Sequence, residues 1–333
     1  MTVTEDRAKQ RSVALRERAA KAAMERRNRW GRRSLILPAV LYTIVVTQIP
    51  FVITIWYSLQ SWNLLRPGSR HFVGLENYTK VFGDAGFRNA VVNTVVFTAS
   101  AVLFSVAVGL VLAVLLDQKF RGRAVVRTLL ISPFLVMPVA GALLWKTTML
   151  NPVFGIVNWV LKPFGVGTLD WASRFPMPTI VAVAVWQWTP FMMIILLSGL
   201  QSQSTDILEA ARVDGAGNWQ IFRRLTMPHL RTYLELCVLL GSIFIVQTFD
   251  SIFMITQGGP GTATTNLPFE LYQSAFRAFD VGEAAALGVI VVFLTIILAT
   301  YALRVISRLF TDPVVASRVI DLSAYRKKEE VAA

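Results

Sequence analysis

Long stretches without a single charged residue are the feature that most limits how this chain can fold. Five of them contain no Asp, Glu, Lys or Arg, at 34–65, 89–116, 128–145, 175–205 and 284–303. A sixth apolar stretch, 232–256, contains only Glu235 and Asp250. A helix that crosses a bilayer needs about 20 predominantly apolar residues. Because these runs are continuous rather than alternating, they exclude barrel strands and leave the helix as the spanning element.

The sequence therefore predicts an all-α polytopic membrane protein. Six transmembrane helices are expected, near 36–60, 90–116, 128–146, 176–200, 232–256 and 284–304. They give three segments: a basic N-terminal arm, 1–34, a six-span domain, 35–310, and a C-terminal tail, 311–333. The arm is expected either to anchor the topology by its charge or to lie as an amphipathic helix on anionic lipid.

Positive charge is distributed unevenly between the two sides of this arrangement. With the N-terminus inside, 25 of the 33 Lys and Arg residues fall inside and 8 fall outside. This bias predicts a multi-pass membrane protein with both termini cytoplasmic. It also accounts for most of the net charge of +13, so binding of nucleic acid is not expected.

The sequence offers little material for catalysis or metal binding. Cys237 is the single cysteine, and His71 and His229 are the only histidines. Neither histidine lies in a predicted span, so an intramembrane enzyme is disfavoured. We expect no catalytic residue, no metal site and no cofactor.

The inside loop 206–228 reads DILEAARVDGAGNWQIFRRLTMP and is more apolar and helix-prone than a simple connection. Asp206 followed by Glu209 is a capping-box pattern, and Gly215 fits the left-handed residue that ends a helix. Asn218 is expected to cap a second short helix, and Pro228 to mark the start of the next span. Two short helices joined by a tight turn would project from the membrane as a docking surface for another protein.

The same loop resembles the EAA loop of ABC importer permeases. Glu209-Ala210-Ala211, Gly215, Leu225 and Met227-Pro228 follow the spacing of that motif. Met227 and Leu225 stand where Leu and Ile are usual. The resemblance implies that this loop is the coupling helix seated in a partner ATPase. The residues expected to make that contact are Glu209, Ala210, Ala211, Asp214, Gly215, Trp219, Phe222 and Pro228.

Other stretches resemble the MalF-like carbohydrate and polyol branch of these permeases. They are 72–78, Asn93-Thr94, Phe249-Asp250 and 256–261. The resemblance implies a bundle of the type I importer kind. It also implies four kinds of partner: a second, MalG-like permease, two ATPase subunits, an extracytoplasmic solute-binding protein and membrane lipid. The chain has no Gly-Lys dipeptide and hence no P-loop, so ATP is expected to bind the partner subunits alone.

Polar residues within the predicted spans are candidates for the substrate path, since they are costly in lipid. Asp250 and Gln247 share one helix face, and Gln187 and Trp188 lie beside Pro190 in the fourth span. Asp250 alternatively fixes the turn before Gly258, and Trp188 alternatively packs against neighbouring helices.

The favoured function is the permease subunit of an ATP-driven, binding-protein-dependent importer of a carbohydrate or sugar alcohol, working by alternating access. A neutral solute is favoured because Lys146 is the only Lys or Arg at the outside edge of the short third span. The alternative is a self-contained, proton-coupled secondary carrier that uses Asp250.

Overall fold

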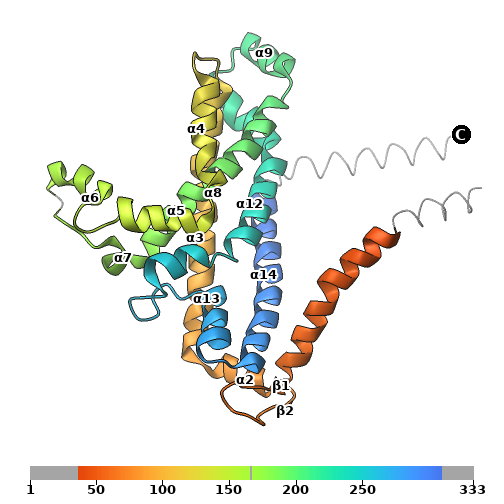
Figure 1. The fold of residues 1–333 in the computed structure, drawn as a ribbon. Coiled ribbons are helices and arrows are strands. Elements are labelled where there is room, and N and C mark those ends of the chain that lie inside the picture. Colours follow the sequence, from red (N-terminus) through yellow and green to blue (C-terminus); the bar gives the residue numbers. More distant parts are fainter. Residues whose placement is uncertain (1–36, 166, 310–333) are drawn as a thin grey trace, which may run out of the picture. The chain divides into compact units, whose positions relative to one another are not determined.

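A computed structural model describes residues 37–165 and 167–309 (Figure 1). The chain divides into two compact units, one ending at Tyr57 and the other beginning at Ser58. The predicted arm, 1–34, and the predicted tail, 311–333, lie outside the described residues. The described residues of the first unit lie in the helix Leu37–Ser58, whose 22 residues are apolar enough to cross a bilayer.

The second unit is almost wholly helical, apart from one two-stranded hairpin made of β1 (Gln60–Ser61) and β2 (His71–Phe72). Its α-helices are α2 Glu76–Gly83, α3 Ala85–Asp117, α4 Arg123–Leu135, α5 Pro138–Leu144, α6 Ile156–Leu161, α7 Trp171–Arg174, α8 Pro176–Gln201, α9 Thr205–Val213, α10 Asn218–Ile221, α11 Met227–His229, α12 Arg231–Ile245, α13 Leu267–Tyr272 and α14 Val281–Leu309. Shorter turns complete it: the 3-10 helix η2 Lys162–Phe164 and the π-helical η1 Trp145–Met149, η3 Phe222–Thr226, η4 Ile252–Thr256 and η5 Gln273–Arg277.

Helices α3 and α8 form the centre of the second unit, with α12 packed against both. Most of α3 and all of α8 lie in long uncharged runs, so the backbone satisfies its own hydrogen bonds while the side chains tolerate lipid or a neighbouring helix. The largest fully buried side chains between them include Phe97, Leu116, Met192 and Leu196. This core holds α8 and α12 in place. The functional residues described below lie on α8, in the break that follows α12 and in the loop between these two helices.

The number of continuous spans differs from the prediction. Within the described part of the chain, four helices are long and apolar enough to cross a membrane, Leu37–Ser58, α3, α8 and α14, or five if one bent pair counts as a span. The all-helical membrane fold is confirmed, whereas the count of six spans is not.

The third predicted span is the bent pair. Its first part, α4, meets the second part, Pro138–Met149, at 101°. Pro138 explains the bend, because proline lacks a backbone N–H and pushes the preceding residue out of the helical region. Met137 accordingly has ψ 131°.

The fifth predicted span breaks after Ile245, and helical structure resumes only at Asp250. Asn266 donates from Nδ2 to the carbonyl oxygen of Thr248 at 2.6 Å. This bond gives a backbone carbonyl in the break the partner that an unbroken helix would have supplied. A side chain distant in sequence therefore stabilises the interruption.

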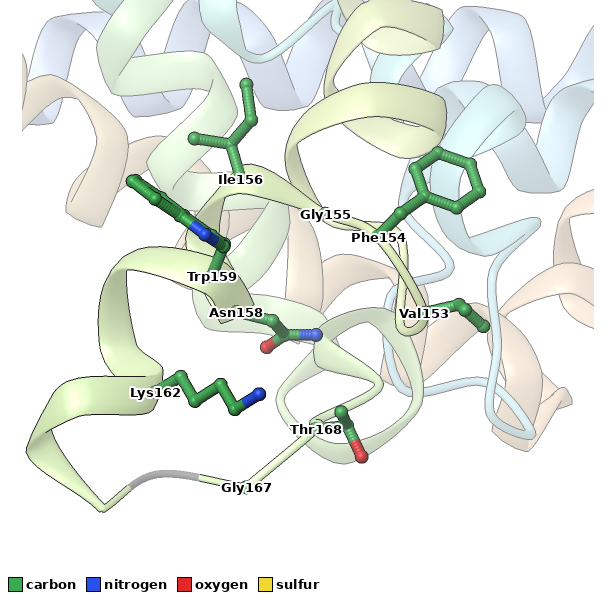
Figure 2. Close-up of a pocket in the computed structure, with 9 residues that line it drawn as sticks. All are labelled: Val153, Phe154, Gly155, Ile156, Asn158, Trp159, Lys162, Gly167 and Thr168. Atoms are coloured by element: carbon green, nitrogen blue, oxygen red, sulfur yellow. The ribbon is translucent and has the colours of Figure 1, made fainter.

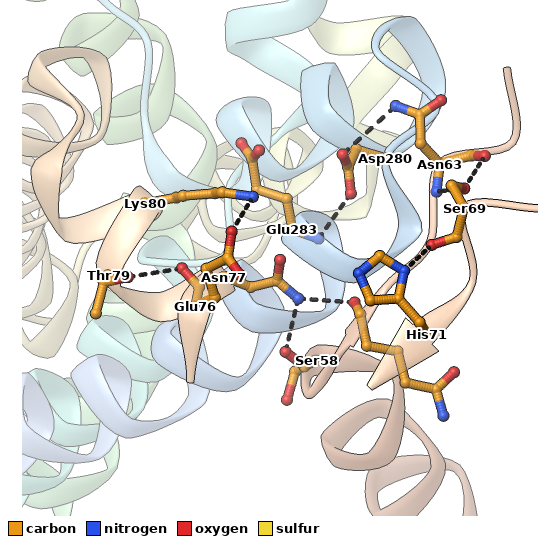
Figure 3. Close-up of polar contacts among 11 residues, drawn as sticks. Ser58, Asn63, Ser69, His71, Glu76, Asn77, Thr79, Lys80, Asp280 and Glu283 are labelled. Atoms are coloured by element: carbon orange, nitrogen blue, oxygen red, sulfur yellow. Dashed lines mark hydrogen bonds and ion pairs between the residues drawn. The ribbon is translucent and has the colours of Figure 1, made fainter. Parts of the chain in front are cut away.

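A hydrogen-bonded network joins the β-hairpin to the start of α14 (Figure 3). The buried Asn77 donates to the carbonyl oxygens of Ser58 at 2.9 Å and Gln60 at 2.8 Å. On the other side, Val281 N donates to Trp62 O at 2.8 Å. Asn77 of the stretch 72–78 therefore anchors the start of the hairpin, and the backbone beside the hairpin joins it to the start of α14.

Asn93 and Thr94 position the loop that precedes α13. Asn93 Nδ2 donates to Thr262 O at 2.8 Å, and Thr94 Oγ1 accepts from Leu267 N at 2.9 Å. Asn266 lies between these two anchored points, so its contact with Thr248 is set in place by α3.

Candidate functional site

The loop 206–228 forms two short helical segments, as predicted, with different caps. Helix α9 begins at Thr205 after Ser204, which has ψ 127°. Asp206 is therefore already inside the first turn, and the predicted capping box from Asp206 to Glu209 is wrong. An acidic residue in that position still interacts favourably with the helix dipole.

The turn at Gly215 matches the prediction. Gly215 has φ +81°, a left-handed conformation that glycine adopts without strain. Gly215 N donates to Arg212 O at 3.0 Å, and Ala216 N donates to Ala211 O at 2.9 Å. These bonds satisfy carbonyls at the end of α9.

The second segment begins one residue earlier than expected. Gly217 is the residue that precedes α10, and its N–H donates to Gln220 Oε1 at 3.1 Å. The prediction that Asn218 is the cap is wrong, because Asn218 is the first helical residue. Pro228 lies within the last turn of this segment, three residues before α12 begins at Arg231.

The loop exposes large apolar side chains among charged ones. No residue of α9 is buried. Val213 is 88% exposed and Trp219 is 70% exposed, and the Trp219 ring stacks on Phe222 at 5.8 Å. The remaining residues predicted to couple to an ATPase, Glu209, Ala210, Ala211, Asp214, Gly215 and Pro228, are exposed or half-buried on the same loop. Apolar side chains in such a setting are typical of a surface that another protein covers.

A polar cluster ties the end of this loop to α8. His229 Nε2 donates to Gly199 O at 3.1 Å, and Ser202 Oγ lies 3.0 Å from both His229 Nε2 and Tyr233 Oη. Sequence reasoning assigned no role to His229. The only available signal was its place next to Pro228, between the loop and a span.

The four residues predicted for the substrate path line one pocket of about 120 Å³. Gln187 and Trp188 come from α8, and Gln247 and Asp250 come from the break that follows α12. The structure thus brings together two pairs that are about 60 residues apart in the sequence. Sequence reasoning missed the other residues that line this pocket, which are Pro138, Ala184, Phe244, Thr248 and Ser251.

Asp250 lies half-buried at the edge of this pocket. Within the described residues, no hydrogen bond or ion pair to its carboxylate is present. The turn that follows is held by threonines instead: Thr264 Oγ1 donates to Gly259 O at 3.1 Å and Thr265 Oγ1 donates to Gly258 O at 3.3 Å. The geometry therefore does not support the alternative role of Asp250, which was to fix this turn.

The other polar groups of the pocket are partly used by the protein. Gln187 Nε2 donates to Val136 O at 3.3 Å, in the bend between α4 and α5. Gln247 Nε2 donates to Ile243 O at 2.9 Å. Both side-chain carbonyls stay available as acceptors.

Trp188 packs within an aromatic cluster. Its ring stacks on Phe244 at 5.6 Å and 11°, and Phe134 lies edge-on at 5.7 Å. The packing alternative for Trp188 is therefore realised on one face of the ring, although the residue still lines the pocket.

Residues 105–311 match the family model described as the binding-protein-dependent transport system inner membrane component. The chain belongs to this family. The match covers both the loop 206–228 and the pocket, so the two candidate sites lie within the part of the permease that defines the family.

Relatives of known or assigned role agree with this membership. A probable ABC transporter permease of Sinorhizobium fredii is 37% identical, over 79% of this chain and 86% of its own. The trehalose/maltose permease MalF of Thermococcus litoralis is 33% identical over 75% and 83%. The sn-glycerol-3-phosphate permease UgpA of Salmonella typhimurium is 32% identical over 84% and 94%.

A solved structure has the same fold. A bacterial ABC transporter that imports the acidic polysaccharide alginate aligns with a TM-score of 0.71 at 20% identity, over 85% of the permease and 96% of that chain. The prediction of a type I importer bundle is thereby confirmed.

The permease is thus a membrane-spanning, multi-pass subunit of an ATP-driven, binding-protein-dependent importer of the inner membrane. It is a transport subunit rather than an enzyme, and partner ATPases hydrolyse ATP. The alternative of a self-contained proton-coupled carrier has no support among its relatives.

Proposed function

We propose that the permease moves a neutral carbohydrate or sugar alcohol past the pocket formed by Gln187, Trp188, Gln247 and Asp250. The observation that carries this proposal is a carboxylate without a protein partner, among the described residues, beside two amide side chains at a break in a membrane helix. Broken helices at membrane depth are where transporters place their ligands. Relatives that carry trehalose/maltose and glycerol phosphate set the range of solutes to consider.

The charges of the pocket favour a neutral solute over an anionic one. Asp250 repels a phosphate or carboxylate, while a hydroxyl group donates a charge-assisted hydrogen bond to it. Lys146, the cation at the outer edge of the third predicted span, donates from Nζ to Met254 O at 2.7 Å. An anionic substrate would need positive charge that this pocket does not contain.

A second permease completes the site in this proposal. The pocket of about 120 Å³ is smaller than the roughly 300–1,000 Å³ typical of ligand pockets. A MalG-like partner would supply the opposite wall. Two ATPase subunits and an extracytoplasmic solute-binding protein would complete the importer.

The loop 206–228 would bind the ATPase subunits and move when they change conformation. Trp219 and Phe222 are the apolar anchor, Ala210 and Ala211 allow close approach, and the turn at Gly215 sets the angle between the two helical segments. Movement of the seated loop would reach α8 through His229, Ser202 and Tyr233. The bias of Lys and Arg supports placing this loop and both termini in the cytoplasm.

Asp250→Asn tests the choice of solute. In the importer purified with its partners and reconstituted in vesicles, uptake of a neutral sugar should weaken by about 10- to 100-fold, the value of a hydrogen bond to a charged group. Asp117→Asn, an exposed acid at the end of α3, is the matched control and should leave uptake unchanged. Two results would contradict the proposal. One is unchanged uptake of the neutral sugar in Asp250→Asn, and the other is uptake of an anionic solute at the same rate by the wild type and by Asp250→Asn.

A further inference from the structure

Residues 153–164, between η1 and α7, carry an unusual density of exposed apolar side chains. Val153 is 86% exposed, Phe154 71%, Trp159 74% and Phe164 79%. Val153, Phe154 and Trp159 line a hollow of about 400 Å³, whose lining also includes Lys162 and Thr168 (Figure 2). An apolar surface of this kind marks contact with a protein or a membrane.

This exposure is built into a folded segment. Asn158 is buried, donates from Nδ2 to Leu169 O at 2.9 Å and accepts at Oδ1 from Trp171 Nε1 at 2.8 Å. Figure 2 shows Asn158 pointing into the loop and Trp159 pointing away from it. The polar side chain therefore holds the fold together while the apolar ones face outward.

The segment leaves the direction of the spanning helices. The chain turns by 101° at the bend before α5, and it returns to a spanning direction only at α8. Helix α6 has six residues, about 9 Å at 1.5 Å per residue, and cannot cross a bilayer. Residues 153–164 thus run across the direction of the spans, shortly before α8 begins. The boundary between lipid and water is expected at such a place.

The charges distinguish a lipid surface from a protein partner. Lys162 is the only charged residue between Lys146 and Asp170. The loop 206–228 instead interleaves its apolar anchors with six charged residues, as interfaces with a polar rim do. Aromatic side chains with an isolated cation match the acyl boundary and phosphate layer of a membrane.

We propose that residues 153–164 are an interfacial anchor that lies in the headgroup layer of the bilayer. Phe154, Trp159 and Phe164 enter the acyl boundary, and the Lys162 ammonium contacts phosphates of anionic lipids. Since α5 begins at Pro138 in the wall of the substrate pocket, the anchor also fixes one side of that pocket at the membrane surface. The anchoring of residues 153–164 in the membrane rests on the chain being a permease of this family, and it does not depend on which solute the permease transports.

The single cysteine makes a direct depth measurement feasible. Cys237 is buried, so Cys237→Ala gives a background for Phe154→Cys and Trp159→Cys, each carrying a nitroxide label. Arg66→Cys, in the exposed connection between β1 and β2, is the aqueous control. The complete importer is reconstituted in vesicles of phosphatidylcholine with and without phosphatidylglycerol, and ATPase activity checks folding.

Oxygen should speed the relaxation of the nitroxides at 154 and 159 more than a water-soluble nickel complex does. The nickel complex should have the larger effect on the nitroxide at 66. Phosphatidylglycerol should deepen the label at 159, and Lys162→Gln should abolish that change. Nickel accessibility at 154 and 159 equal to that at 66 would overturn the proposal. So would low accessibility to both reagents that rises when the partner subunits are removed, since that result means a protein interface.

Discussion

Gly199 lies where α8 packs closely against the start of α12, beneath the loop 206–228. A Cβ atom there would lie 2.6 Å from the Tyr233 ring and 2.8 Å from Leu230 Cδ2. The absence of a side chain lets His229 reach the Gly199 carbonyl and join the loop to both helices. Helix contacts in membranes commonly depend on small residues in this way.

Gly199→Ala should lower stability by about 1–3 kcal/mol, the usual cost of overpacking, because the Tyr233 ring must move. Thermal unfolding of the detergent-solubilised protein measures the change. Gly83→Ala, at a glycine with open space around it, is the control and should unfold at nearly the wild-type temperature. Equal unfolding temperatures for Gly199→Ala and wild type would show that the helices are not packed this closely.

At the scale of elements, the two interrupted spans supply polar groups in and around the pocket that we propose as the substrate path, beside Gln187 of the continuous α8. The bend before α5 presents the Val136 carbonyl to Gln187, and the break after α12 presents Thr248 and Asp250. The bend could be foreseen from Pro138. The break could not, because its stabilising partner, Asn266, reaches Thr248 only through tertiary packing of the loop on α3.

Asn266 supports two elements at once, so its amide and carbonyl can be tested separately. The side chain accepts from Phe269 N at 3.1 Å as the cap of α13, and it donates to Thr248 O at 2.6 Å. Asn266→Ala should cost about 2–4 kcal/mol, since both buried backbone groups lose a partner. Asn266→Ser retains an oxygen that can cap α13 but loses the amide donor to Thr248, so it should cost less. Chemical denaturation compares them, and equal losses would contradict the separate roles.

Glu270 on α13 makes stability depend on pH. Burial raises the pKa of Glu270 above its ordinary value of 4.5, and the charges of Asp84 and Glu283 raise it further. The folded state therefore holds this proton more tightly than the unfolded state, and stability from this group is lost as pH rises through the folded pKa. As the pH rises from about 4.5, the unfolding temperature of the wild type should fall, and that of Glu270→Gln should fall less. An identical pH profile for the variant would contradict this assignment.

At the scale of the whole molecule, sequence alone predicted the helical membrane fold, the family and the two short helical segments of the loop 206–228. These follow from local signals: uncharged runs, the Lys and Arg bias and a fixed motif spacing. The four pocket residues were also named, because polar side chains are rare in spans. The count of continuous spans and the link from His229 to α8 depend on contacts between distant segments. The caps of α9 and α10 are local, and they differ from the prediction because Ser204 and Gly217, rather than Asp206 and Asn218, precede the two helices.

The most direct test of an importer driven through the loop 206–228 is sugar uptake into vesicles containing the purified assembly, with and without ATP. Gly215→Val places a β-branched residue at φ +81° and should abolish ATP-dependent uptake. Gly217→Ala changes a neighbouring glycine with negative φ and open space and should retain it. Uptake that needs no ATP and is unchanged in Gly215→Val would contradict the central claim that this permease is moved by partner ATPases through that loop.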